Sequence, residues 1–266
     1  MKCLITGGAG FMGSHLAEEL AKEGVQVVII DDLSSGKKEN LPLKAKFYKA
    51  DICDPKISRI FQKEMPDAVF HFAAHIEARS SVQKPIEDAR VNILGSLNIL
   101  ENCRRWNVKK IVFASSGGEV YGAALQLPVS ETSVPRPVSP YGVGKLAVEY
   151  YLNSYFSLFG IPSLVVRYGN VFGPRQNPYG ESGVVAICIK TILRGEQFVI
   201  HGEGSQTRDY IYVKDAIKAT VLSFQKNLQG IYNIGTGTET SVSEVFSRIK
   251  KLMNSLREPR YGQLPL

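Results

Sequence analysis

The chain has 266 residues, of which 44% are hydrophobic, enough for one sizeable core with a smaller lobe attached. No segment approaches the roughly 18 apolar residues of a membrane helix, and no apolar leader follows Met1-Lys2, so we expect a cytoplasmic protein with no membrane partner. The 32 basic and 25 acidic residues give a net charge of +7, scattered in doublets, which disfavours a nucleic-acid partner.

Short apolar strands alternate with longer helical patterns along the first part of the chain. This alternation predicts an α/β fold, in which a doubly wound parallel sheet of the Rossmann type is covered by helices on both faces. The strands are predicted over Lys2–Thr6, Gln26–Ile30, Lys46–Lys49, Ala68–Phe72, Lys110–Ala114 and Leu164–Tyr168, and the helices over Met12–Glu23, Pro55–Glu64, Pro85–Trp106 and Pro140–Phe159.

A glycine-rich loop follows the first predicted strand and leads directly into a helix. Gly7, Gly10 and Gly13 have the G-x-x-G-x-x-G spacing, which permits a tight turn and a close approach of the backbone to phosphate. The N-terminus of the helix adds free N–H groups and partial positive charge. The loop therefore predicts a dinucleotide site, and we assign residues 1–168 to the binding domain and residues 169–266 mainly to a smaller C-terminal substrate lobe, interleaved with the sheet.

The second predicted strand ends in Asp31-Asp32, where a carboxylate binds the ribose hydroxyls of adenosine. Because that carboxylate would repel a 2′-phosphate, we expect NAD as the cofactor, although the nearby Lys37 and Lys38 keep NADP open. Asp51-Ile52, after the third strand, is expected to border the adenine.

The segment Ser139–Lys145 has the features of a helix start, with Ser139 as the cap and proline in the first turn. Tyr141 and Lys145, four residues apart, lie on one helix face, where an ammonium group favours the phenolate and suits the tyrosine as a general base. Tyr210 and Lys214 share this spacing, but they span a strand and a helix start.

The four cysteines and the histidines carry no metal-site spacing, so we expect buried free thiols and no metal. His71 is interpreted as a strand residue, and His75 as a loop residue whose backbone borders the cofactor.

Together these residues resemble the extended short-chain dehydrogenase/reductase family, and within it the UDP-glucose (UDP-galactose) 4-epimerases and related nucleotide-sugar epimerases. The resemblance rests on Thr6–Gly13, Asp31–Gly36, His71–Ala74, Ser115–Gly122, Ser139–Lys145, Arg167–Gly173 and Arg208–Val213. It implies that Tyr141 and Lys145 are catalytic, and that NAD stays bound while the sugar is oxidised to a 4-keto form and reduced again. The residues expected to line NAD, besides Tyr141 and Lys145, are Gly7, Gly10, Phe11, Met12, Gly13, Asp31, Asp32, Leu33, Ser34, Ser35, Gly36, Asp51, Ile52, Phe72, Ala73, Ala74 and Tyr168.

The resemblance also implies a nucleotide-sugar substrate, a UDP-sugar above all, bound by Ser116, Tyr141, Asn170, Val184 and Arg208. For Arg208 the alternative is a surface pair with Asp209. The chain stops at Leu266, earlier than family members usually do, and the family's remaining tail supplies another arginine. We therefore expect a truncated or naturally short substrate lobe.

The catalytic hydroxyl departs from the family pattern, since Gly117 stands three residues before Val120, where a hydroxyl is usual. Adjacent strand residues point to opposite faces, so we assign the role to Ser116 and expect Ser115 to face the backbone or the cofactor. The two following glycines would let the chain turn so that Ser116 reaches the sugar.

Three other functions remain open at this stage. They are a nucleotide-sugar 4,6-dehydratase, for which Glu119 fits but Gly118 lacks the acid; a UDP-glucuronate decarboxylase; and a non-catalytic NAD-binding regulator. The predicted helices Pro85–Trp106 and Pro140–Phe159 resemble the two that form a four-helix homodimer interface in the family. The alternative is that Leu97, Tyr151 and Phe156 simply pack on the sheet.

Overall fold

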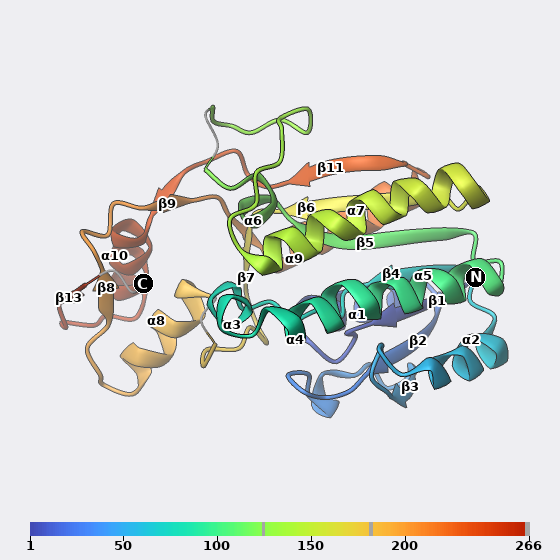
Figure 1. Ribbon diagram of the computed structural model, residues 1–266. Coiled ribbons are helices and arrows are strands. Elements are labelled where there is room, and N and C mark those ends of the chain that lie inside the picture. The colour runs from blue at the N-terminus through green and yellow to red at the C-terminus, as the bar shows by residue number, and fades with distance from the viewer. Residues whose placement is uncertain (124–125, 181–182, 264–266) are drawn as a thin grey trace.

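The computed structural model describes residues 1–123, 126–180 and 183–263 (Figure 1). Its main sheet has seven strands in the order β11-β6-β5-β4-β1-β2-β3, all parallel. These strands are β1 Lys2–Thr6, β2 Gln26–Asp31, β3 Lys46–Lys49, β4 Ala68–His71, β5 Lys110–Ser116, β6 Ser163–Tyr168 and β11 Gly230–Ile234. The chain winds outward from β1 in both directions, which confirms the doubly wound α/β fold.

Helices cover both faces of this sheet because its strands are apolar on both sides. On one face, α1 (Phe11–Lys22) and α9 (Val213–Gln225) pack over a core that includes Ile5 and Ile29. On the other face, α2, α5 and α7 pack over a second core. They span Ser58–Glu64, Ser96–Arg105 and Pro140–Phe159. Among the described residues, no helix combines the length and the apolar character needed to cross a membrane.

A smaller lobe gathers at the end of the molecule away from the N-terminus, where Figure 1 shows α8, α10, β8 and β13 together. It has its own apolar core, formed by Cys188, Phe198, Ile200, Val245, Phe246 and Ile249. Its elements are α8 Val184–Leu193, β8 Val199–His201, β9 Thr207–Arg208, β12 Thr240–Ser241, α10 Val242–Leu252 and β13 Arg260–Gly262. The chain returns to the main layer between these elements, since α9 and β11 pack there.

The remaining short elements lie in the connections between the longer strands and helices. They are η1 Lys38–Asn40, η2 Pro55–Ile57, α3 Ala78–Gln83, α4 Pro85–Ala89, η3 Arg90–Gly95, α6 Gly117–Tyr121, β7 Asn170–Phe172 and β10 Tyr210–Tyr212. The helix predicted over Pro85–Trp106 is therefore divided into α4, the wider π-helical turn η3, and α5. Within η3 the Asn92 side chain forms hydrogen bonds with the backbone of His75, a contact that the sequence pattern does not predict.

Candidate functional site

A pocket of about 1340 Å³ runs along the carboxyl ends of the strands, from the glycine loop to the smaller lobe. This is where parallel doubly wound sheets bind their ligands, because the strand order reverses there. All the predicted site residues except Leu33 and Gly36 line it: Gly7, Gly10, Phe11, Met12, Gly13, Asp31, Asp32, Ser34, Ser35, Asp51, Ile52, Phe72, Ala73, Ala74, Ser116, Tyr141, Lys145, Tyr168, Asn170, Val184 and Arg208.

The glycine loop brings its backbone closer to its neighbours than any side chain would allow. Gly7 has a φ of +71°, and a Cβ there would lie 2.6 Å from the amide nitrogen of Ala73. A Cβ on Gly13 would lie 2.2 Å from the carbonyl oxygen of Gly7. Helix α1 begins after Gly10, so its first N–H groups point out of the helix end with no partner inside the helix. The loop can therefore hold a diphosphate against backbone donors.

Asp31 is positioned at the end of β2 and is only 7% exposed. Its carboxylate accepts hydrogen bonds from the amides of Ala9, at 2.9 Å, and Leu33, at 2.8 Å. Burial raises the pKa of Asp31, and these two amides offset part of that rise. Gly36 packs behind the carboxylate, since a Cβ there would lie 2.8 Å from Asp31 Oδ1. Leu33 and Gly36 thus hold Asp31 in place and do not line the pocket.

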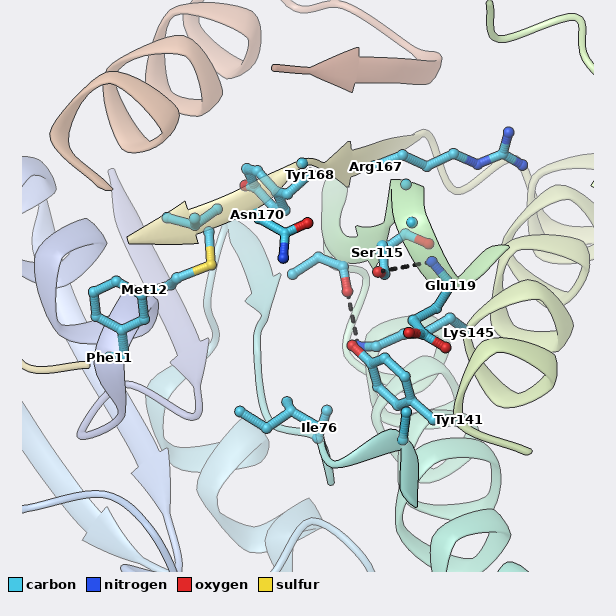
Figure 2. A pocket seen from close by; sticks show the side chains of 18 of the residues that line it. Phe11, Met12, Ile76, Ser115, Glu119, Tyr141, Lys145, Arg167, Tyr168 and Asn170 are labelled. Atoms are coloured by element: carbon cyan, nitrogen blue, oxygen red, sulfur yellow. Dashed lines mark hydrogen bonds between the residues drawn. The ribbon is translucent and has the colours of Figure 1, made fainter. Parts of the chain in front are cut away.

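Tyr141 and Lys145 lie on the first turns of α7, and both side chains reach the same end of the pocket (Figure 2). Ser139 caps the helix by accepting a hydrogen bond from the Gly142 amide at 3.1 Å. The Lys145 ammonium lies 5.8 Å from the centroid of the Tyr141 ring and donates to the carbonyl of Ala114 at 2.8 Å. Helix α7 and strand β5 together therefore fix the relative position of the pair.

The expected lowering of the tyrosine pKa is wrong for this arrangement. Burial raises the pKa of Tyr141 above its ordinary value, and the charges of Glu119 and Asp88 raise it further, while hydrogen bonding by Ser116 lowers it. Burial also lowers the pKa of Lys145 to about 8. The ammonium donates to the Ala114 carbonyl, and burial is the largest effect on the pKa of the phenol.

The two serines at the end of β5 have different surroundings. Ser116 lines the pocket and caps the short helix α6, with its Oγ accepting from the Glu119 amide at 3.4 Å. The Ser115 hydroxyl donates to Glu149 Oε1 at 2.5 Å beneath α7. Ser115 lines the pocket as well, so the expectation that it faces the backbone or the cofactor stays a prediction. The hydrogen bond to this buried carboxylate was not expected. The glycines after Ser116 begin α6 instead of forming a loose turn.

The far end of the pocket is lined by residues expected to bind a sugar nucleotide. Arg208 is exposed in β9, and its guanidinium donates to the Thr207 carbonyl at 2.7 Å. Asp209 does not pair with it in this structure, because its carboxylate accepts from the amides of Thr236 and Gly237. The alternative of a surface pair is therefore wrong, and the cation lines the pocket with Asn170 and with Val184 at the start of α8.

The histidines and cysteines have structural surroundings. His71 is buried between Thr6 and Ser96, with ring nitrogens 2.7 and 2.8 Å from their hydroxyl oxygens, and burial lowers its pKa to about 3. His75 lines the pocket from a loop, as expected. Three of the four free cysteines are buried, whereas Cys53 is half-buried.

Two side chains that sequence reasoning did not connect with Tyr141 support its position at the start of α7. Ser81, in α3, accepts a hydrogen bond from the Tyr141 amide at 3.1 Å. Glu119 accepts from the Ser139 hydroxyl at 2.7 Å and so joins α6 to the start of α7. No motif spacing indicates Ser81, which is 60 residues from its partner.

The fold and the site together define an enzyme of the extended short-chain dehydrogenase/reductase type. The family model described as "NAD dependent epimerase/dehydratase family" matches residues 3–235, so the chain belongs to that family, whose cofactor is NAD. A putative UDP-glucose 4-epimerase from Methanocaldococcus jannaschii is 45% identical over 247 residues, which cover 93% of this chain and 81% of that protein.

Two solved structures support the same family assignment. The crystal structure of UDP-glucose 4-epimerase from Thermotoga maritima with UDP-glucose superimposes with a TM-score of 0.96 at 44% identity, covering 100% of this chain and 86% of that one. The Thermus thermophilus UDP-glucose 4-epimerase complexed with NAD gives a TM-score of 0.94 at 41% identity, covering 98% and 86% of the two chains.

Proposed function

We propose that this chain is a nucleotide-sugar 4-epimerase that interconverts UDP-glucose and UDP-galactose. The observation that carries the proposal is the continuity of one pocket, which joins the glycine loop and Asp31 to Tyr141, Lys145 and Ser116. Arg208 gives the far end a cation suited to a diphosphate. The Thermotoga structure with UDP-glucose, a relative of 44% identity, supports this choice of substrate.

The residues of the loop fit NAD, because the glycine positions leave no room for a Cβ and Asp31 presents its carboxylate at the ribose position. The glycine loop and Asp31 would hold NAD, which would supply a reversible hydride acceptor for C4 of the sugar. Tyr141 removes the proton of the 4-hydroxyl and later gives it back, which is general base and then general acid catalysis. Ser116 donates a hydrogen bond to the same oxygen, and Lys145 holds the tyrosine and the ribose in position.

The site favours epimerisation over the alternative reactions. Glu119 lines the pocket, as a 4,6-dehydratase would require, but its carboxylate is bonded to Ser139 and the neighbouring Gly118 supplies no acid partner. A UDP-glucuronate decarboxylase is distinguished by its product in the test described next. A regulator without catalysis would have no need for a tyrosine, a lysine and a serine gathered at one end of the pocket.

The test is to incubate the protein with a panel of UDP- and dTDP-sugars and to identify the products by NMR. The proposal expects UDP-galactose from UDP-glucose, with no net consumption of NAD. A deoxy-keto sugar, a pentose or no product would contradict it, and each result points to one of the three other functions.

We further propose that α5 and α7 form the interface of a homodimer. Two large side chains of α7 point away from the sheet, since Tyr151 is 40% and Phe156 is 47% exposed, whereas Leu97 packs against the core. Exposed aromatic side chains on a helix surface are typical of an interface. Light scattering at micromolar concentration should give twice the mass of the 29.3 kDa chain. A monomer mass would contradict the proposal.

A further inference from the structure

A buried carboxylate lies against the turn of α7 that carries the catalytic pair. Asp88, in α4, is 3% exposed and does not line the pocket. A Cβ placed on Gly144 would lie 3.6 Å from Asp88 Oδ2 and 3.3 Å from the Cβ of Asn92. Gly144 immediately precedes Lys145 and lies three residues after Tyr141. The carboxylate therefore reaches the helix between Tyr141 and Lys145.

The position of Asp88 is fixed by η3. The Asn92 amide donates to Asp88 Oδ1 at 2.8 Å. The same side chain also donates to the His75 carbonyl and accepts from the His75 amide, both at 2.9 Å. Asn92 thus links the carboxylate to a loop that lines the pocket. This network leaves Asp88 little freedom to turn away from α7.

The other carboxylate near Lys145 already has a partner of its own. Glu149, one helical turn after Lys145, accepts from Arg167 Nε at 3.0 Å and pairs with the Arg167 guanidinium at 2.5 Å. It also accepts from Ser115. Lys145, by contrast, donates to the neutral carbonyl of Ala114. A charge buried to 4% exposure needs a compensating charge, and Glu149 is largely balanced by Arg167.

We propose that Asp88 is the counter-ion of Lys145 and a positioning residue that sets the charge state of the Tyr141–Lys145 pair. This role in catalysis rests on the proposed function. The pairing itself rests on the placement of the two buried charges. Asp88 does not line the pocket, so substrate can enter without meeting this carboxylate.

The electrostatic effects agree with this placement, since the Asp88 charge raises the pKa of both Tyr141 and Lys145. Burial raises the pKa of Asp88 itself, and His75, Asn92 and Lys145 offset part of that rise. The titratable groups facing the pair are Asp88 from α4, Glu119 from α6, Glu149 from α7 itself and His71 from β4.

The first test compares the pH profiles of kcat for Asp88→Asn and for the matched control Glu87→Gln. Glu87 is the neighbouring residue of α4, but its side chain is 51% exposed and faces Lys84 at 3.8 Å. Removing the Asp88 charge lowers the pKa of both Tyr141 and Lys145. Both limbs of the profile should therefore move to lower pH, by about one unit, while Glu87→Gln should match the wild type. An unmoved Asp88→Asn profile would overturn the proposal.

The second test needs neither substrate nor NAD. Melting temperatures are measured for Asp88→Asn, Lys145→Met and the double variant. Each single change leaves one buried charge without its partner, so each should melt below the wild type. The double variant should melt above Lys145→Met alone, because the orphaned carboxylate is removed as well. A double variant that melts below Lys145→Met, or does not fold, overturns the pairing. Absence of turnover in the wild type would refute only the proposed function.

Discussion

The two ends of the pocket are constructed in different ways. At the nucleotide end, the proposed binding groups are the Asp31 carboxylate and backbone amides whose placement depends on Gly7 and Gly13 having no side chain. At the catalytic end, the binding groups are side chains, such as those of Tyr141 and Ser116, which come from different elements. The nucleotide end tolerates few changes of its backbone, because its geometry is set by residues close together in the chain. The catalytic end depends on contacts between residues far apart in the chain. Its chemistry can therefore be altered by removing a single functional group.

The largest effect is expected from Tyr141→Phe, which removes the acid–base group of the catalytic end and leaves the ring. We expect kcat to fall by roughly 10⁴-fold, because the variant lacks the group proposed to transfer the proton of the 4-hydroxyl. Steady-state rates with UDP-glucose measure this loss. Calorimetry with NAD should show unchanged affinity, because the nucleotide end is intact. Substantial remaining activity would remove Tyr141 from its assigned role.

A smaller loss is expected from Ser116→Ala, roughly 10²–10³ in kcat by analogy with oxyanion stabilisation, with NAD binding preserved. The matched variant is Ser115→Ala. It removes a hydrogen bond to the buried Glu149 carboxylate, so it should lower the melting temperature and change kcat less.

The reverse pattern would contradict the assignment of Ser116. If both serine variants keep their activity while Tyr141→Phe is inactive, the tyrosine works without a serine hydroxyl.

At the nucleotide end, Asp31→Ala should reduce the preference for NAD over NADP by roughly tenfold to 100-fold, which corresponds to one or two charged hydrogen bonds. Asp32→Ala is the comparison, because Asp32 is exposed and bonds to Ser34. Calorimetric titration with both cofactors measures the preference. Equal affinity of the wild type for NAD and NADP would contradict the role of Asp31.

Away from both ends, Glu64→Gln should leave turnover unchanged and alter only stability. Burial alone would raise the pKa of Glu64, but hydrogen bonds from Lys46, Tyr48 and Lys2 lower it to about 2, against an ordinary value of 4.5. A folded-state pKa below the unfolded value stabilises the fold above about pH 4.5, and this contribution is lost as the pH falls toward 2.

Thermal melting of wild type and Glu64→Gln from pH 7 to pH 2 checks this prediction. The two curves should converge at the acid end, while the surface variant Glu39→Gln should follow the wild type throughout. A constant difference between wild type and Glu64→Gln at every pH would contradict the assigned pKa.

The nucleotide end was predictable from the sequence because its determinants are consecutive. The strand, the glycines and Asp31 follow one another within 31 residues, and each acts on its immediate neighbours. The placement of Tyr141 and Lys145 together at the pocket was predictable for a similar reason, since they lie four residues apart on one helix.

What the sequence did not reveal depends on contacts between distant elements. The Ser115 hydroxyl faces Glu149, 34 residues away, and the pKa of Tyr141 reflects burial that no local pattern records. The Asp88 carboxylate reaches α7 only because η3 and Gly144 bring the helices together. Such contacts follow from packing of the whole fold, so local spacing could not predict them.

In the proposed reaction, one pocket oxidises and reduces the sugar at C4 without releasing the intermediate. The most direct measurement uses UDP-glucose carrying deuterium at C4, with the product UDP-galactose analysed by NMR and mass spectrometry. We predict that the deuterium remains at C4, because the hydride taken from the sugar returns to the same carbon. Loss of the deuterium, or formation of a product other than UDP-galactose, would contradict the account.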